Sequence, residues 1–219
     1  MQYLEPINPV DFVARLEPML ATNDLNGLLH TLQNDFSSHQ LKSLMTCPCG
    51  DARKVATLAL GLVGGCCCIP YLTLQLADPD PMANQIAEHA LWSIWFRMSS
   101  PAANDLLSRG TRSMETAEFQ AAEQLYTQAI AIDSQFSEAY NQRAILYYLR
   151  ENFEDSISDC KSAIELMPCH FGAWAGMGHC YTQLNQISQA IGCYEKALQI
   201  NPRMDCIREA LGELRKFKR

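Results

Sequence analysis

The stretch SAIELMP at residues 162–168 returns almost unchanged as KALQINP at residues 196–202, 34 residues further along the chain. A fixed period of this length is the signature of stacked structural repeats, so it decides how the rest of the sequence is interpreted. A third copy lies one period upstream. The aligned small or aromatic residues are Ala129, Ala163 and Ala197; Tyr126, Cys160 and Tyr194; and Gly110, Ala144 and Gly178.

Each copy predicts two helices joined by a short polar turn. In residues 137–170, Tyr140, Ala144 and Tyr147 are three or four residues apart and therefore share one face of a first helix. A second helix follows and ends at Pro168, because proline cannot donate the backbone hydrogen bond that a helix interior requires. One such pair is too small to bury its own apolar face, so we expect it to stack on neighbouring pairs.

This pattern resembles that of the tetratricopeptide repeat family. The third copy carries the family's aromatic, small and proline positions most completely, at Trp174, Gly178, Tyr181, Ala190, Tyr194, Ala197 and Pro202. The resemblance implies three helical hairpins followed by a capping helix. The three hairpins are expected at residues 103–136, 137–170 and 171–204, which together fill the segment 103–204. The capping helix is expected at residues 205–219.

The amino-terminal half carries a weaker repeat, in which KVATLALG at 54–61 overlays QIAEHALW at 85–92. The phrase resembles the short HEAT-like repeats of phycobilisome-lyase relatives, which implies further helical hairpins over residues 1–98. We therefore expect an all-α protein, an α-solenoid in which HEAT-like hairpins precede three tetratricopeptide hairpins and a capping helix. Ser100 and Pro101 mark the junction, as a serine cap and a proline at the first helical position.

Composition and charge argue against several classes of function. The net charge is −7 and neither half has a basic excess, so we predict that the protein binds neither nucleic acid nor an anionic membrane surface. The longest apolar stretch, residues 55–77, contains Gly-Gly and a proline and is too broken for a membrane-spanning helix. No secretory signal is visible at the amino terminus, so the ten cysteines are interpreted as reduced thiols of a cytoplasmic protein.

Two cysteine clusters, TCPCGD at 46–51 and GGCCCIP at 64–70, are the candidates for a metal or redox site. A helix over 51–61 would hold the two clusters about 16 Å apart, which is too far for both to supply ligands to one zinc ion. We interpret them as buried or loop thiols, with a redox or metal site as the alternative. No motif for nucleophilic catalysis or for phosphate binding is present, so we predict no catalytic residues, no metal and no cofactor.

The tetratricopeptide resemblance implies that the first helix of each hairpin lines a concave groove for an extended or helical peptide. The expected groove residues are Leu107, Thr111, Met114, Asn141, Ile145, Tyr148, Ala175, His179 and Thr182. The amide of Asn141 can both donate to and accept from a peptide backbone. Some family members clamp the carboxy-terminal carboxylates of heat-shock chaperones with lysine, asparagine and arginine side chains. Leu107 and Gln142 stand where the first lysine and an asparagine are expected, so we predict no chaperone-tail clamp.

The leading functional hypothesis is a non-catalytic adaptor that presents this groove to a peptide or helix of a protein partner. An accessory or lyase-like enzyme subunit is the alternative, implied by the HEAT-like resemblance. Self-association into a homo-oligomer through the amino-terminal stack is a third option. The simplest competing interpretation is that the nine groove positions are only the exposed surface of a scaffold, because scattered surface hydrophobics are normal.

Overall fold

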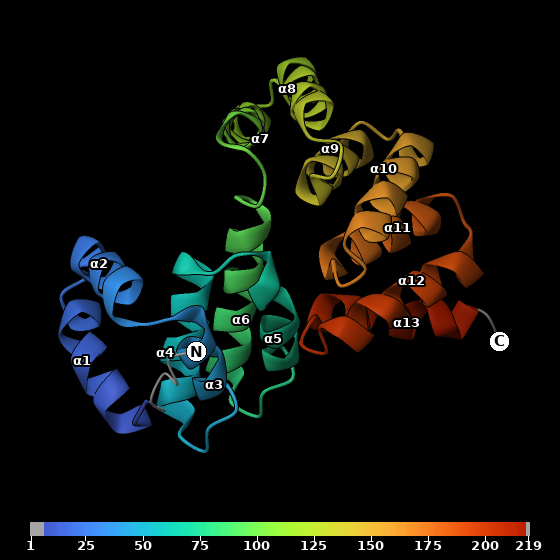
Figure 1. Cartoon of the computed structure of the whole chain (residues 1–219). Coiled ribbons are helices and arrows are strands. Elements are labelled where there is room, and N and C mark those ends of the chain that lie inside the picture. The colour runs from blue at the N-terminus through green and yellow to red at the C-terminus, as the bar shows by residue number, and fades with distance from the viewer. Residues whose placement is uncertain (1–6, 218–219) are drawn as a thin grey trace. The chain divides into compact units, whose positions relative to one another are not determined.

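The computed structural model describes residues 7–217 and the side chains of residues 7–216, and within that range all regular secondary structure is helical (Figure 1). The α-helices are α1 (Pro9–Ala21), α2 (Leu25–Asp35), α3 (Ser38–Leu44), α4 (Gly50–Val63), α5 (Ile69–Gln75), α6 (Pro81–Trp95), α7 (Pro101–Glu115), α8 (Phe119–Ile132), α9 (Ser137–Leu149), α10 (Phe153–Leu166), α11 (Phe171–Gln183), α12 (Ile187–Ile200) and α13 (Asp205–Phe217). A short 3-10 helix, η1, covers Cys66–Cys68. The prediction of an all-α protein is confirmed.

The chain forms two compact units, Met1–Ile94 and Trp95–Arg219. No helix within the described residues has the length and apolar character needed to cross a membrane. The first six residues of the predicted segment 1–98 and the last two of the predicted cap 205–219 lie outside the described part of the chain.

The second unit consists of the hairpins α7–α8, α9–α10 and α11–α12, which follow one another along the chain, and of α13 (Figure 1). Each hairpin turns at a residue with a left-handed backbone: Ala117, Glu151 and Asn185, with φ of 59°, 60° and 56°. In each turn the next amide donates to a carbonyl five residues earlier, as from Glu118 to Ser113 at 2.8 Å. This Schellman arrangement satisfies carbonyls at the end of the first helix. The turns are 34 residues apart, so the sequence period is also a conformational period.

The first unit begins with a hairpin of the same local geometry. Asn23 has a φ of 53°, and the amide of Asp24 donates to the carbonyl of Met19 at 2.9 Å. The carboxylate of Asp24 then caps α2 by accepting from the amide of Gly27. Helical hairpins are expected over residues 1–98, but neither of the two sequence repeats extends to this pair of helices.

Helices α4 and α6 of the first unit approach each other closely at Gly61. A Cβ atom there would lie 2.7 Å from the Cβ of Ala90, and the hydroxyl of Ser93 donates to the Gly61 carbonyl at 3.2 Å. The two helices contain the overlaid segments 54–61 and 85–92 of the weaker repeat. The relation of this unit to HEAT-like repeats stays a prediction. The structure also adds α3, whose capping box between Ser37 and Gln40 is a signal present in the sequence.

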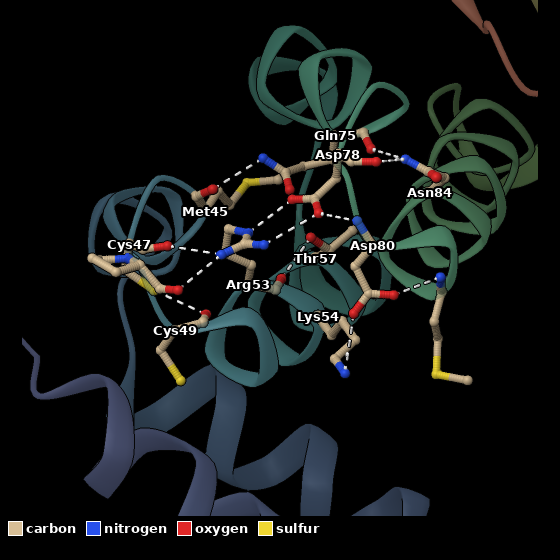
Figure 2. A network of polar contacts seen from close by, with 12 residues as sticks. Met45, Cys47, Cys49, Arg53, Lys54, Thr57, Gln75, Asp78, Asp80 and Asn84 are labelled. Atoms are coloured by element: carbon tan, nitrogen blue, oxygen red, sulfur yellow. Dashed lines mark hydrogen bonds and ion pairs between the residues drawn. The ribbon is translucent and has the colours of Figure 1, made fainter.

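A polar network ties together the loops that flank α4 and α5 (Figure 2). The guanidinium of Arg53 makes a two-pronged contact with the carboxylate of Asp78, with Nε to Oδ2 at 2.8 Å and Nη2 to Oδ1 at 3.2 Å. Its third nitrogen donates to the carbonyls of Cys47 and Pro48. Asn84 donates to three carbonyls of residues 75–78, so this network fixes both loops at once.

The hairpins of the second unit pack through a glycine that faces a tyrosine ring. A Cβ atom at Gly178 would lie 2.4 Å from Tyr194, and one at Gly110 would lie 2.5 Å from Tyr126. Both tyrosines are buried. The middle hairpin has Ala144 in place of the glycine and Cys160 in place of the tyrosine. The larger residue on its first helix is therefore matched by a smaller residue on its second helix.

We expect Gly178→Ala to destabilise the second unit by about 2 kcal/mol, because the added methyl group overlaps the rigid Tyr194 ring. Gly192→Ala is the matched control: its Cβ meets no atom within 4 Å, so alanine should stabilise α12 by up to about 1 kcal/mol. Urea unfolding followed by circular dichroism measures both. Equal midpoints for the two variants would refute the close packing at Gly178.

Candidate functional site

The predicted groove residues of the first hairpin belong mainly to its packed interior. Leu107 is fully buried, and Met114 packs against the same apolar cluster. The hydroxyl of Thr111 donates to the Leu107 carbonyl of its own helix at 3.1 Å. Leu107 therefore presents no side-chain surface for a ligand, whereas Thr111 and Met114 are half-buried.

The middle and third hairpins bring four of the predicted residues together: Asn141, Ile145, Tyr148 and His179. They border a pocket of about 220 Å³, whose remaining lining residues are Ala144, Ser156, Cys160 and Gly176. Ile145 is 39% exposed at its edge, whereas Asn141 is almost completely buried. Of the other predicted residues, Ala175 is buried and Thr182 is half-buried.

The pocket occupies the place that a tyrosine ring fills in the neighbouring hairpins. Tyr194 packs against Gly178, and its hydroxyl contacts His179 at 2.8 Å and Thr182 at 3.3 Å. The residues one period before Gly178, His179 and Thr182 are Ala144, Ile145 and Tyr148. All three line the pocket. The tyrosine position itself is taken by Cys160. The loss of the ring therefore explains the hollow.

The polar groups at the base of the pocket are bonded to one another. The Ser156 hydroxyl donates to the Ala144 carbonyl at 2.8 Å, and the Cys180 thiol donates to the Ser156 oxygen at 3.1 Å. Burial raises the pKa of the Cys160 thiol and keeps it protonated at neutral pH. The base of the pocket is therefore uncharged, and its internal hydrogen bonds favour an apolar guest.

The rim of the pocket is aromatic and uncharged. The rings of Tyr148 and His179 lie 6.2 Å apart, and Tyr148 also contacts Phe153 at 5.7 Å between ring centroids. Burial lowers the pKa of His179, so its imidazole is neutral at pH 7. Aromatic and imidazole faces of this kind suit a flat or branched apolar group.

A buried polar cluster holds Asn141 in place beside the pocket. Its amide donates to Oε1 of Glu138 at 3.2 Å, and Gln142 donates to the same oxygen at 2.6 Å. The other carboxylate oxygen of Glu138 lies 2.8 Å from Nε2 of His170. Because Nδ1 of His170 accepts from the Ala173 amide at 3.1 Å, the ring proton is on Nε2 and donates to Glu138.

Four of the pocket residues, Ala144, Ser156, Cys160 and Gly176, were not predicted as functional. The alignment of Cys160 with Tyr126 and Tyr194 is visible in the sequence, but no functional role is assigned to Cys160 there. A small residue where both neighbouring repeats have a tyrosine is the signal that could have located the pocket. Within the described residues, no group of three or more histidine, cysteine or acidic side chains is placed to hold a metal ion.

Comparison with known proteins relates the chain to tetratricopeptide repeats. Residues 172–204 match the family model for the tetratricopeptide repeat. A repeat-containing protein of Rhizobium etli is 29% identical over 125 residues, which are 57% of this chain and 60% of that protein. A small glutamine-rich tetratricopeptide repeat-containing protein of Dictyostelium discoideum is 31% identical over 109 residues, half of this chain and 33% of that protein. The chain thus spans less than two thirds of these relatives.

Solved structures agree with the hairpin architecture. The first tetratricopeptide repeat domain of Spaghetti (RPAP3), bound to an HSP90 peptide, superposes with a TM-score of 0.53 at 22% identity, over 54% of this chain and 94% of that one. The Sgt2 domain from Aspergillus fumigatus gives a TM-score of 0.51 at 24% identity, over 53% of this chain and 79% of that one. Residues 172–204 thus form a tetratricopeptide repeat, and about half of the chain shares the fold of tetratricopeptide repeat domains.

Proposed function

We propose that the protein is a non-catalytic adaptor whose second unit binds a peptide or helix of a partner protein. The observation that carries this proposal is the pocket between the middle and third hairpins, which is uncharged, aromatic at its rim and large enough for one apolar side chain. An apolar anchor in a preformed pocket supplies most of the affinity in many protein interfaces. The nine groove residues, the segment boundaries and the cytoplasmic location stay predictions that accompany this proposal.

The proposed ligand is an apolar segment and not an acidic chain end. None of the nine predicted groove residues is a lysine or an arginine. Arg143 of α9 and Arg150, which follows the end of α9, are already paired, with Asp159 and Glu123 respectively. We therefore expect no micromolar binding of the peptide SRMEEVD, the HSP90 peptide bound to the Spaghetti domain. Tight binding of this peptide would overturn this part of the proposal.

A displayed library of random twelve-residue peptides, selected on the full chain, tests the proposal. Enriched peptides are expected to share one large apolar residue and to lose at least about tenfold in affinity on Ile145→Glu, because a carboxylate at the rim disfavours an apolar guest. Ile132→Glu is the matched control: Ile132 is 53% exposed and does not line the pocket, so this variant should bind as wild type does.

Fluorescence anisotropy with the selected peptides measures these affinities, and circular dichroism establishes that each variant is folded. Failure to enrich any peptide, or equal affinity for Ile145→Glu and Ile132→Glu, would contradict binding at this pocket. The alternative role of the first unit in an enzyme assembly stays a prediction, as does self-association.

A further inference from the structure

A small cluster of nucleophilic and cationic groups lies in the first unit, where η1 follows α4. The sulfur of Cys67 is 3.3 Å from the ammonium nitrogen of Lys42 and 3.9 Å from the sulfur of Cys68. Cys67 is exposed, whereas Cys68 is fully buried. The cluster thus combines an accessible thiol with two neighbouring hydrogen-bond donors.

Each of the two donors is held in position by other groups. Lys42 lies on α3, and its ammonium group is 5.2 Å from the centroid of the Tyr71 ring, which stabilises a cation at that place. Burial raises the pKa of Cys68, so this thiol stays protonated and its S–H group donates a hydrogen bond to the sulfur of Cys67. The charge of Lys42 and the S–H of Cys68 therefore converge on one sulfur atom.

A cation and a second donor beside a thiol stabilise its thiolate form. The hydrogen bond from Lys42 is the main cause that lowers the pKa of Cys67, and the contact with Cys68 adds to it. The thiolate is the nucleophilic form of cysteine, and oxidation follows thiolate character and exposure. Cys66 and Cys206 are also exposed, but within the described residues neither accepts a hydrogen bond from a lysine or arginine.

We propose that Cys67 is a redox-modification site, at which the thiolate held by Lys42 and Cys68 reacts with hydroperoxides. The sulfur attacks one peroxide oxygen, so an S–O bond forms and the O–O bond breaks. The leaving hydroxide or alkoxide takes a proton from solvent. Cys67 is oxidised to a sulfenic acid, and the peroxide is reduced to water or an alcohol. This site is independent of the pocket in the second unit.

Competitive alkylation of the full chain tests the proposal. With limiting iodoacetamide near pH 7, we expect Cys67 to react at least about fivefold faster than Cys66, its exposed neighbour on the same short helix. Fragmentation mass spectrometry of the peptide that carries both residues assigns the label. After treatment with hydrogen peroxide, a sulfenic-acid reagent such as dimedone should label Cys67 first.

Variants of Lys42 separate its electrostatic effect from simple exposure. Lys42→Met should bring the rate of Cys67 down to that of Cys66, whereas Lys42→Arg, which keeps the charge, should retain most of the difference. Lys161→Met, an exposed lysine of α10, is the control and should leave the ratio unchanged. Equal rates for Cys66 and Cys67 in the wild type would overturn the proposal. So would an unchanged ratio in Lys42→Met.

Discussion

Replacing Asp78 with asparagine is expected to destabilise the first unit by about 3 kcal/mol, because it removes one partner of a buried ion pair. The side chains of Arg53 and Asp78 are 16% and 5% exposed, so water cannot replace the lost contact. The carboxylate also accepts from the amide of Asp80 at 2.9 Å. An asparagine would turn one N–H group toward the guanidinium or toward this amide, and it would leave the Arg53 charge uncompensated.

The effect should be local as well as global, because Arg53 also binds the loop before α4 (Figure 2). Amide hydrogen exchange should therefore speed up in residues 45–49 and 76–84 of Asp78→Asn, and urea unfolding should shift to lower concentration. Asp51→Asn is the matched control. Asp51 is 71% exposed and pairs with Lys54 at the surface, so its loss should cost less than about 1 kcal/mol. Equal unfolding of the two variants would refute a structural role for the Arg53–Asp78 pair.

The same pair predicts a pH dependence. The hydrogen bond from Arg53 lowers the pKa of Asp78 below its usual 3.8, so the carboxylate is favoured in the folded state. Its stabilising contribution is therefore fully present above about pH 4 and is lost as the pH falls through the lowered pKa. The stability difference between wild type and Asp78→Asn should be constant from pH 7 to pH 5 and should shrink below pH 4. A difference that stays constant down to pH 2 would contradict this assignment.

The sequence predicted the hairpins well because their packing positions recur. Small residues such as Gly110, Ala144 and Gly178 stand where two helices meet, and their spacing records that requirement directly. The turn positions Ala117, Glu151 and Asn185 share a left-handed backbone but no residue type. Their conformation is therefore set by the pairing of the two helices, which residue identity alone does not reveal.

Contacts without a period could not be predicted in the same way. Arg53 and Asp78 are 25 residues apart in a unit whose repeat is weak, and nothing in their local sequence marks them as partners.

The groove shows a different limit of sequence-based prediction. The groove is expected from the tetratricopeptide resemblance, and three of its residues, Leu107, Asn141 and Ala175, are buried, although Asn141 borders the pocket. Helix α9 packs beside α7, and α11 beside α9, so the neighbouring hairpin covers part of each first helix.

Cys160→Tyr alone is expected to destabilise the second unit by about 3 kcal/mol, at the upper end of the usual cost of overpacking. The new ring would follow the course of Tyr126 and Tyr194, which pass within 2.5 Å of where a Cβ would stand at Gly110 and Gly178. In the middle hairpin that Cβ exists, on Ala144. Ala144→Gly alone should cost about 1 kcal/mol, because glycine is a poor helix former.

The double variant Ala144→Gly/Cys160→Tyr should lose about 2 kcal/mol less unfolding free energy than the two single variants lose in sum, because residues in direct contact do not act additively. It restores the glycine–tyrosine arrangement of both neighbouring hairpins and fills the pocket. Urea unfolding of the wild type and the three variants gives the coupling energy. Additive effects would mean that Cys160 does not stand in the place of the missing ring. If the double variant folds as expected, it should also lose the peptides selected on the wild type, since the space for their apolar side chain is then occupied by the chain's own tyrosine.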